Sequence, residues 1–183
     1  MITDLDCIEP IPLALLREPL EWFFAEHFRQ RKLCLLLDAL ATSRAFNEAP
    51  IRAARDFIAR DLPLHILDEE EDFFPLLRRR SAPEDEIENV LGVLSADHRA
   101  DIAAAAEVRR LFTDVLQARR ALGSNPSAQR IVKAFSDQER RHLALENAVV
   151  LPIARMRVSS GDLKALSQRL AARRGVVLEE QPA

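Results

Sequence analysis

The sequence is poor in the residues that build strands, tight turns and disulfide frameworks. Its 183 residues include four glycines, two cysteines and no tyrosine, and they show few β-branched runs beside abundant Ala, Leu, Arg and Glu. This composition favours helices almost everywhere. Cys7 and Cys34 are too few for a disulfide framework and lack metal-ligand spacing. The length suits one domain with a substantial core.

Basic character and long apolar segments are also missing. The net charge of -3 leaves no basic footprint for nucleic acid, and the arginines at 78–80 fall at a predicted helix end, where they complement the helix dipole. No apolar run approaches the roughly 18 residues of a membrane span. The first residues carry acids where a secretory signal needs positive charge. We therefore expect a cytoplasmic protein with no nucleic-acid or membrane partner.

Clusters of turn-forming residues divide the chain into helical segments. These clusters lie at 42–50, 81–85, 123–127 and 158–162. The predicted long helices are 17–43, 49–79, 84–121 and 127–157, and a short helix is predicted at 161–173. Four long helices with short connections are typical of an antiparallel up-down-up-down four-helix bundle, so the expected fold class is all-α. The expected parts are an N-terminal extension at 1–16, the bundle at 17–157, and a short C-terminal helix and tail at 158–183.

Proline, cap and aromatic residues add local expectations. Local bends or early helix ends are expected at Pro63, Pro75 and Pro152, which fall inside helical patterns. Ser160 or Asp162 is expected to cap the short helix, and Gly175 to stop it. Helical spacing predicts a core role for the phenylalanines at 23, 24, 28, 73, 74, 112 and 135.

Each predicted long helix carries one of the four histidines, which are His27, His65, His98 and His142. On the second and fourth helices a glutamate, Glu69 or Glu146, follows four residues later, so imidazole and carboxylate share a face about 5 to 6 Å apart. A single such pair is common on a solvated surface. All six groups in one core layer would leave unpaired charge that costs several kcal/mol per group. Metal ions would remove that cost.

The spacing of the histidines from the turns tests whether they can meet. Around turns near 45 and 82, the flanking histidines lie at heights that agree within about one helical turn. Around the third turn, near 124, the mismatch between His98 and His142 is about 12 Å. The third helix should therefore overhang, bend, or end before the stretch at 118–129 does.

The type and number of the candidate ligands narrow the choice of metal. Four imidazoles and two carboxylates without thiolates suit iron or manganese rather than a structural zinc site. Two carboxylates that each span two ions fit a dinuclear centre. Each ion would then have two histidine nitrogens and two bridging oxygens, a solvent oxo or hydroxo bridge, and a position for a small ligand.

A ferritin-like centre is the rival arrangement. Glu139 and His142 form one ExxH pair of the ferritin type, but no second pair precedes His27, His65 or His98. The remaining acids near the histidines are expected mostly to face solvent or neighbouring arginines. They are Glu26, Glu70, Glu71, Asp97 and Asp101.

In the order of these residues the chain resembles the hemerythrin-like domain, also called the HHE cation-binding domain. The resemblance covers about residues 20–157 and depends on His27, on His65 and Glu69 with "FFPLL", on "DHRADI" around His98, and on His142 and Glu146 with "VVLPIA". It implies an antiparallel bundle around a non-haem di-iron centre, with the histidines as terminal ligands and the glutamates as bridges. Oxygen-carrying members place another histidine where this chain has Ile102. The four-histidine set is similar instead to the bacterial iron-centre repair and stress-related relatives.

The expected function follows from this resemblance and from the ligand set. We expect a di-iron protein that binds or reduces a small oxidant such as O2, NO or peroxide, with manganese or zinc as substitute ions. The electron donor and the oligomeric state cannot be read from the sequence. A second interpretation is a non-enzymatic iron, redox or gas sensor, or an iron store, that signals through a partner protein. A third is a helical bundle without metal.

Overall fold

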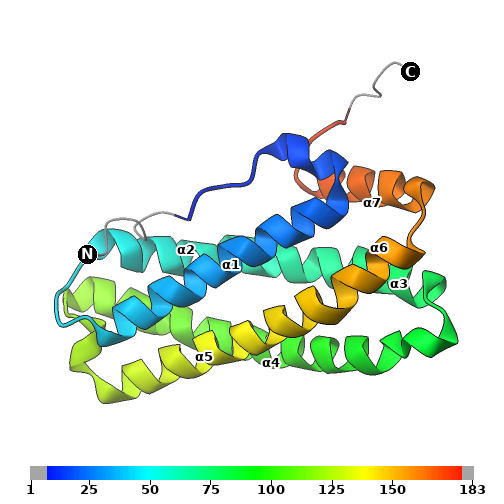
Figure 1. Ribbon diagram of the computed structural model, residues 1–183. Coiled ribbons are helices and arrows are strands. Elements are labelled where there is room, and N and C mark those ends of the chain that lie inside the picture. Colours follow the sequence, from blue (N-terminus) through cyan, green and yellow to red (C-terminus); the bar gives the residue numbers. More distant parts are fainter. Residues whose placement is uncertain (1–7, 179–183) are drawn as a thin grey trace.

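The computed structural model describes residues 8–178, and every regular element within them is helical. Four long rods lie side by side and antiparallel, with α7 packed beside them near one end (Figure 1). The rods are α1 (Pro19–Thr42); α2 (Glu48–Asp68), η2 (Glu69–Phe73) and α3 (Phe74–Arg80); α4 (Ile87–Ala118); and α5 (Pro126–Leu145), η5 (Glu146–Val150) and α6 (Leu151–Arg157). Outside the rods lie η1 (Leu13–Arg17), η3 (Pro83–Asp85), η4 (Leu122–Ser124) and α7 (Ser160–Arg173). The predicted all-α bundle with a short C-terminal helix is confirmed.

The helix ends fall within about three residues of the predicted ones. The third rod ends at Ala118, where the 118–129 stretch begins, and this shortening lets His98 and His142 reach the same level. The cap of α7 is Ser159 rather than Ser160, with Asp162 completing a reciprocal capping box. Gly175 follows the helix with φ +68, as expected of a residue that stops it. Parts of the predicted extension and tail, at 1–7 with Cys7 and at 179–183, lie outside the described residues.

Two of the three internal prolines follow a change of helix type. A five-residue π turn lies just before both Pro75 and Pro152. In each case the residue that precedes the proline, Phe74 or Leu151, donates its backbone N–H to the carbonyl oxygen five residues earlier, that of Glu69 or Glu146. A proline lacks the N–H that an α-helix needs and clashes with the carbonyl four residues earlier, and the wider π turn relieves both problems. Pro63, by contrast, lies within continuous α2.

Apolar side chains form two clusters, one toward each end of the bundle. The first gathers at the end where α3, α6 and α7 meet and includes Phe23, Phe73 and Phe74. The second lies around the opposite turns and includes Phe112 and Phe135. The histidines separate the two clusters. The expected core role is wrong for the phenylalanines at 24 and 28, which are 45% and 51% exposed. No helix among residues 8–178 combines the length and apolarity needed to cross a membrane.

Buried ion pairs fix α7 to the second rod. Asp68 is fully buried and accepts hydrogen bonds from Arg173 and, at 2.6 Å, from Arg174. Asp72 accepts a further bond of 2.7 Å from Arg173. The guanidinium of Arg174 also stacks over the ring of Trp22, 4.7 Å from its centroid. These contacts lie within and beside the π turn that begins at Glu69, so α7 braces that turn.

Asp68→Asn should lower the free energy of unfolding by about 3 kcal/mol, because it leaves two arginines facing a neutral amide in a buried site. Urea unfolding followed by circular dichroism measures this change. The matched control is Glu88→Gln, which breaks the exposed pair between Arg78 and Glu88 and should cost less than about 1 kcal/mol. Equal losses in the two variants would contradict the bracing role of Asp68.

Candidate metal centre

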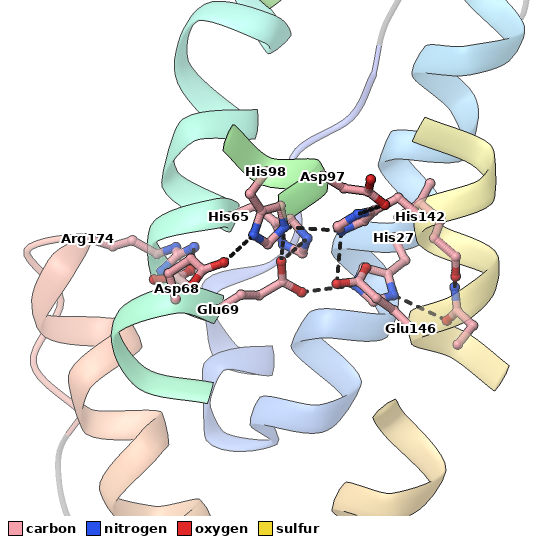
Figure 2. Close-up of polar contacts among 12 residues, drawn as sticks. His27, His65, Asp68, Glu69, Asp97, His98, His142, Glu146 and Arg174 are labelled. Carbon is pink, nitrogen blue, oxygen red and sulfur yellow. Dashed lines mark hydrogen bonds and ion pairs between the residues drawn. The ribbon is translucent and has the colours of Figure 1, made fainter. Parts of the chain in front are cut away.

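The six side chains singled out in the sequence converge at the middle of the bundle, between the two apolar clusters. Each rod contributes one histidine, and the two glutamates are the first residues of the π turns η2 and η5. The six point toward one another from the four rods (Figure 2). All are buried, with exposed fractions of 1–4%. They are His27, His65, Glu69, His98, His142 and Glu146.

Their ligand atoms fall into two overlapping groups, and within each group all of the atoms lie within 4.8 Å of one another. Each group joins two histidines to the same two glutamates. The members are His27 and His65 in one group, His98 and His142 in the other, and Glu69 and Glu146 in both. Because each carboxylate has two oxygens, a shared glutamate can reach two cations. The cluster is therefore consistent with a di-metal site.

Hydrogen bonds hold the outward ring nitrogen of two histidines. His98 Nδ1 lies 2.7 Å from Glu70 Oε1, and His27 Nδ1 lies 3.2 Å from Asn147 Oδ1. The Asn147 amide is oriented by a 2.6 Å bond from its nitrogen to the carbonyl oxygen of Leu143. Both partners of the rings are acceptors, so each Nδ1 carries a hydrogen and donates it. In the neutral rings Nε2 then presents a lone pair to the cluster, as metal binding requires.

The histidine Nε2 atoms and the glutamate oxygens that face the cluster are hydrogen-bond acceptors that lie close to one another. His98 Nε2 lies 3.1 Å from His142 Nε2 and 3.3 Å from Glu69 Oε2, and His27 Nε2 lies 3.3 Å from Glu146 Oε2. Lone pairs at these distances repel unless a cation lies among them. Several buried atoms of the cluster have no hydrogen-bond partner among residues 8–178: His27 Nε2, both ring nitrogens of His65, Glu69 Oε2 and both oxygens of Glu146. The residues present thus fit a pair of metal ions.

Without metal, protons supply the compensating positive charge. Burial lowers the pKa of His142, but the adjacent Glu146 carboxylate outweighs burial, and the pKa rises to about 10. Burial also opposes protonation of His27 and His98, and nearby carboxylates, chiefly of Glu146 and Glu69 respectively, raise the pKa of both. Burial, with the charge of His27, holds the pKa of His65 well below its ordinary value. Metal binding must displace these protons, so acid weakens it.

A second polar layer lies one helical turn from the histidines. Its three polar members line a narrow gap, called the cavity below, that has no room for a water-sized molecule, together with Leu62 and the histidine rings: Gln30, Asp101 and Glu139. They are 1–3% exposed. Glu139 precedes His142 by three residues and Glu146 follows it by four, so this layer lies on the side of the histidines away from the shared glutamates. The amide nitrogen of Gln30 has no hydrogen-bond partner among the described residues.

The buried carboxyl of Glu139 makes the metal-free protein sensitive to pH. Burial, with the charge of Asp101, raises the pKa of Glu139 from 4.5 to about 8. The folded chain therefore keeps this proton up to about pH 8, whereas the unfolded chain releases it near pH 4.5. This group makes stability fall as the pH rises from 4.5 to 8, and it adds no further change above that range.

Glu139→Gln, which stays neutral, should stabilise the metal-free protein by a few kcal/mol at pH 8 and by almost nothing at pH 4. Urea unfolding across this range measures the difference. Glu107→Gln replaces an exposed glutamate of α4 and serves as the control, with no comparable pH dependence. A stabilisation that is as large at pH 4 as at pH 8 would show that Glu139 is not protonated in the fold.

The sequence did not predict the residues that hold the histidine rings. Glu70 and Asn147 each follow a shared glutamate directly, and each contacts a histidine of another rod. The position after each glutamate in the repeated HxxxE pattern could have located them. Asp97, also expected to face solvent, lies 3.8 Å from Nδ1 of His142. Ile102 is 62% exposed, and the neighbouring Asp101 points inward in its place.

The other acids divide between solvent and core. Glu26 is buried beside Arg29, at 3.2 Å, as expected of an acid with a neighbouring arginine, and Glu71 is exposed. Glu139, the acid of the ferritin-like ExxH pair, belongs to neither group of metal-ligand atoms. The acids near the cluster therefore differ in their surroundings. Among them, only Glu70 and Asp97 approach a histidine nitrogen that faces away from the cluster.

Comparison with known proteins agrees with this arrangement. Residues 18–155 match the family described as the hemerythrin HHE cation binding domain, whereas no curated protein matches the chain. The matched segment runs from the residue before α1 into α6, so it contains three rods in full, all but the last two residues of the fourth, and all six converging side chains, and it leaves out α7. Because the match covers most of the chain and ends with the bundle that holds the cluster, the chain belongs to the hemerythrin HHE cation-binding domain family.

Proposed function

We propose that this protein holds a non-haem di-iron centre and binds or reduces a small oxidant, such as O2, NO or peroxide. The observation that carries the proposal is the buried cluster of four histidines and two shared glutamates. Two shared carboxylates close one side of the histidine layer, and the closely packed polar layer with the unpaired Gln30 amide lies on the other. Imidazole and carboxylate donors without thiolate suit iron. The chain's four histidines, with Ile102 exposed, favour the repair and stress-related relatives over the oxygen carriers.

The residues of the chain have distinct roles in this proposal. The four histidines and two glutamates would hold the ions, and Glu70 and Asn147 orient the rings of His98 and His27. Iron, when bound, supplies the electron chemistry. Leu62 and Ile66 are the apolar members of the cavity lining, and a small ligand would enter only where these and the neighbouring side chains move apart.

Two cavity residues supply hydrogen bonds and protons. The Gln30 amide nitrogen has no partner among the described residues and would donate a hydrogen bond to a ligand that opens the cavity. The carboxyl of Glu139 lines the same cavity, and in the metal-free protein burial raises its pKa, so that it holds its proton more firmly than an exposed glutamate does. Reduction of oxygen or peroxide consumes protons, and the Glu139 oxygen is placed to provide one.

Gln30→Leu should weaken the binding of azide to the iron-loaded, oxidised protein about fivefold, because it removes one hydrogen bond worth about 1 kcal/mol. Optical titration measures the affinity, and metal analysis should show unchanged iron content. Ser136→Ala is the matched control, since Ser136 is buried and hydrogen-bonded on α5 but lies outside the cavity. Unchanged azide affinity in Gln30→Leu would contradict a ligand-contacting role for the amide.

A sensor or store is the second candidate, and the bracing of α7 favours it. Asp68 and Asp72 flank Glu69 along the chain and bind arginines of α7 and the residue after it. A change at Glu69 on iron loss or ligand binding would therefore reach an outer helix that a partner protein could contact. This candidate requires no turnover.

One experiment separates the two candidates. The protein is reconstituted with ferrous iron without oxygen and is then given NO or hydrogen peroxide together with a chemical reductant. Consumption that continues over many turnovers supports reduction of a small oxidant. A single stoichiometric reaction per centre supports the sensor or store. Less than about one iron per chain after reconstitution would contradict both.

A further inference from the structure

The outer face of α1 carries an exposed stripe at coiled-coil spacing. Its members follow one another at alternating intervals of three and four residues: Glu21, Phe24, Phe28, Arg31 and Leu35. This is the spacing of the a and d positions that form the contact line of a coiled coil. The three apolar members, Phe24, Phe28 and Leu35, are 45%, 51% and 54% exposed. We call these five residues the α1 seam.

The α1 seam is separate from the core of the bundle. The inward face of α1 carries buried residues such as Phe23, His27 and Leu33, and α1 lies on the outside of the bundle (Figure 1). On the seam, the Arg31 guanidinium lies 5.7 Å from the ring centroid of Phe24 and 5.9 Å from that of Phe28. The seam is therefore a line of exposed apolar side chains with adjacent charge, and such a line marks a contact surface.

The order of charges along the seam selects the partner and its direction. Phe24 and Phe28 lie at equal distances on either side of the level of residue 26, and so do Glu21 and Arg31. An antiparallel second copy, related by a two-fold axis at this level, would place its Phe28 against Phe24 and its Arg31 against Glu21, each contact occurring twice. Antiparallel coiled coils pair a with d positions in this way. A parallel copy would face Glu21 with Glu21.

We propose that the α1 seam is the interface of a symmetric dimer, in which two copies of this chain pair their α1 helices in antiparallel orientation. Aromatic pairs form its centre, and ion pairs between Glu21 and Arg31 fix its register. The interface lies on the outward side of α1, away from buried residues such as Phe23 and Leu33, so each copy supports the other's α1 from outside. The dimer requires no metal.

Charge reversal tests the dimer on the full-length chain. Sedimentation velocity across a concentration series gives the dissociation constant, first for the wild type, which should pass from monomer to dimer. Glu21→Arg and Arg31→Glu should each raise this constant at least about tenfold, because each places like charges opposite one another twice. The double reversal should restore it to within a few-fold. Within one chain the two positions are about 15 Å apart. Glu21 also pairs with Arg155 of its own chain at 3.0 Å, and that pair is lost in the single Glu21→Arg variant and in the double variant alike, so recovery in the double variant reports contact with a second copy.

Two further variants complete the test, with circular dichroism to confirm that each is folded. Phe28→Glu should abolish the dimer. Ile102→Glu changes an apolar side chain of α4 that is 62% exposed, and it should leave the dimer intact. Three results would overturn the proposal: a wild type that stays monomeric at all concentrations, a dimer that survives Phe28→Glu, or single reversals that the double reversal does not rescue.

Discussion

Glu146→Gln should leave at most one tightly bound iron per chain, whereas Glu139→Gln should keep two. Both glutamates lie on the fourth rod and are 1% and 2% exposed, but only Glu146 belongs to both groups of ligand atoms. A neutral amide cannot bridge two cations as a carboxylate does. Loss of residues that only orient ligands costs up to about a hundredfold in metal affinity, and loss of a shared ligand should cost at least as much. Metal analysis after anaerobic reconstitution and removal of loose iron gives the count.

The comparison of these two variants also tests the ferritin-like alternative. In that arrangement Glu139 and His142 would act together, so Glu139→Gln would lose iron to the same extent as Glu146→Gln. Circular dichroism of both variants separates loss of a ligand from loss of the fold. Two irons retained in Glu146→Gln would exclude Glu146 as a bridge.

Removal of the metal should lower the melting temperature by about 20 °C at neutral pH. An ion present at about a thousand times its dissociation constant stabilises the folded state by about 4 kcal/mol, and two ions by about 8 kcal/mol. A chain of 183 residues gains about 0.4 kcal/mol per kelvin of entropy on unfolding. The ratio of these quantities gives the shift. Calorimetry of iron-loaded and chelated protein measures it.

The doubly substituted variant His65→Ala, Glu146→Ala is the control, because iron should change its melting temperature by only a few degrees. The shift in the wild type should also shrink as the pH falls toward 5, since protons then compete with the ions for the histidines. Identical melting of loaded and chelated wild type would favour the third interpretation, a helical bundle that needs no metal.

The sequence predicted the four rods and the convergence of the histidines because both can be inferred from local features of the sequence. Turn-forming clusters mark the helix ends, and one histidine per rod is visible without a structure. The π turns were not predictable, because Pro75 and Pro152 show only that a regular helix is disturbed. Whether the chain bends, ends or widens its turn depends on packing. In the structure the turn widens at Glu69 and Glu146.

The burial of the phenylalanines on α1 is a second feature that the sequence did not predict correctly. Phe23 is fully buried, whereas Phe24 beside it is 45% exposed. Buried residues cover so much of α1 that the apolar pattern has no clear direction, and helical spacing alone predicted a core role for both. The acids around the histidines were missed for a related reason. Charged residues usually face solvent, and only contacts from other rods reveal that Asp101 does not.

The position of the polar layers between two apolar clusters has a consequence for local stability. Helical bundles usually open first at their ends, where helices fray, and hold longest in the middle. Here both ends have apolar cores, and the middle holds buried polar groups, several of which have no hydrogen-bond partner among the described residues. Removal of the metal should therefore speed amide hydrogen exchange most in the middle of the rods, where bound ions would join two halves that have apolar cores of their own.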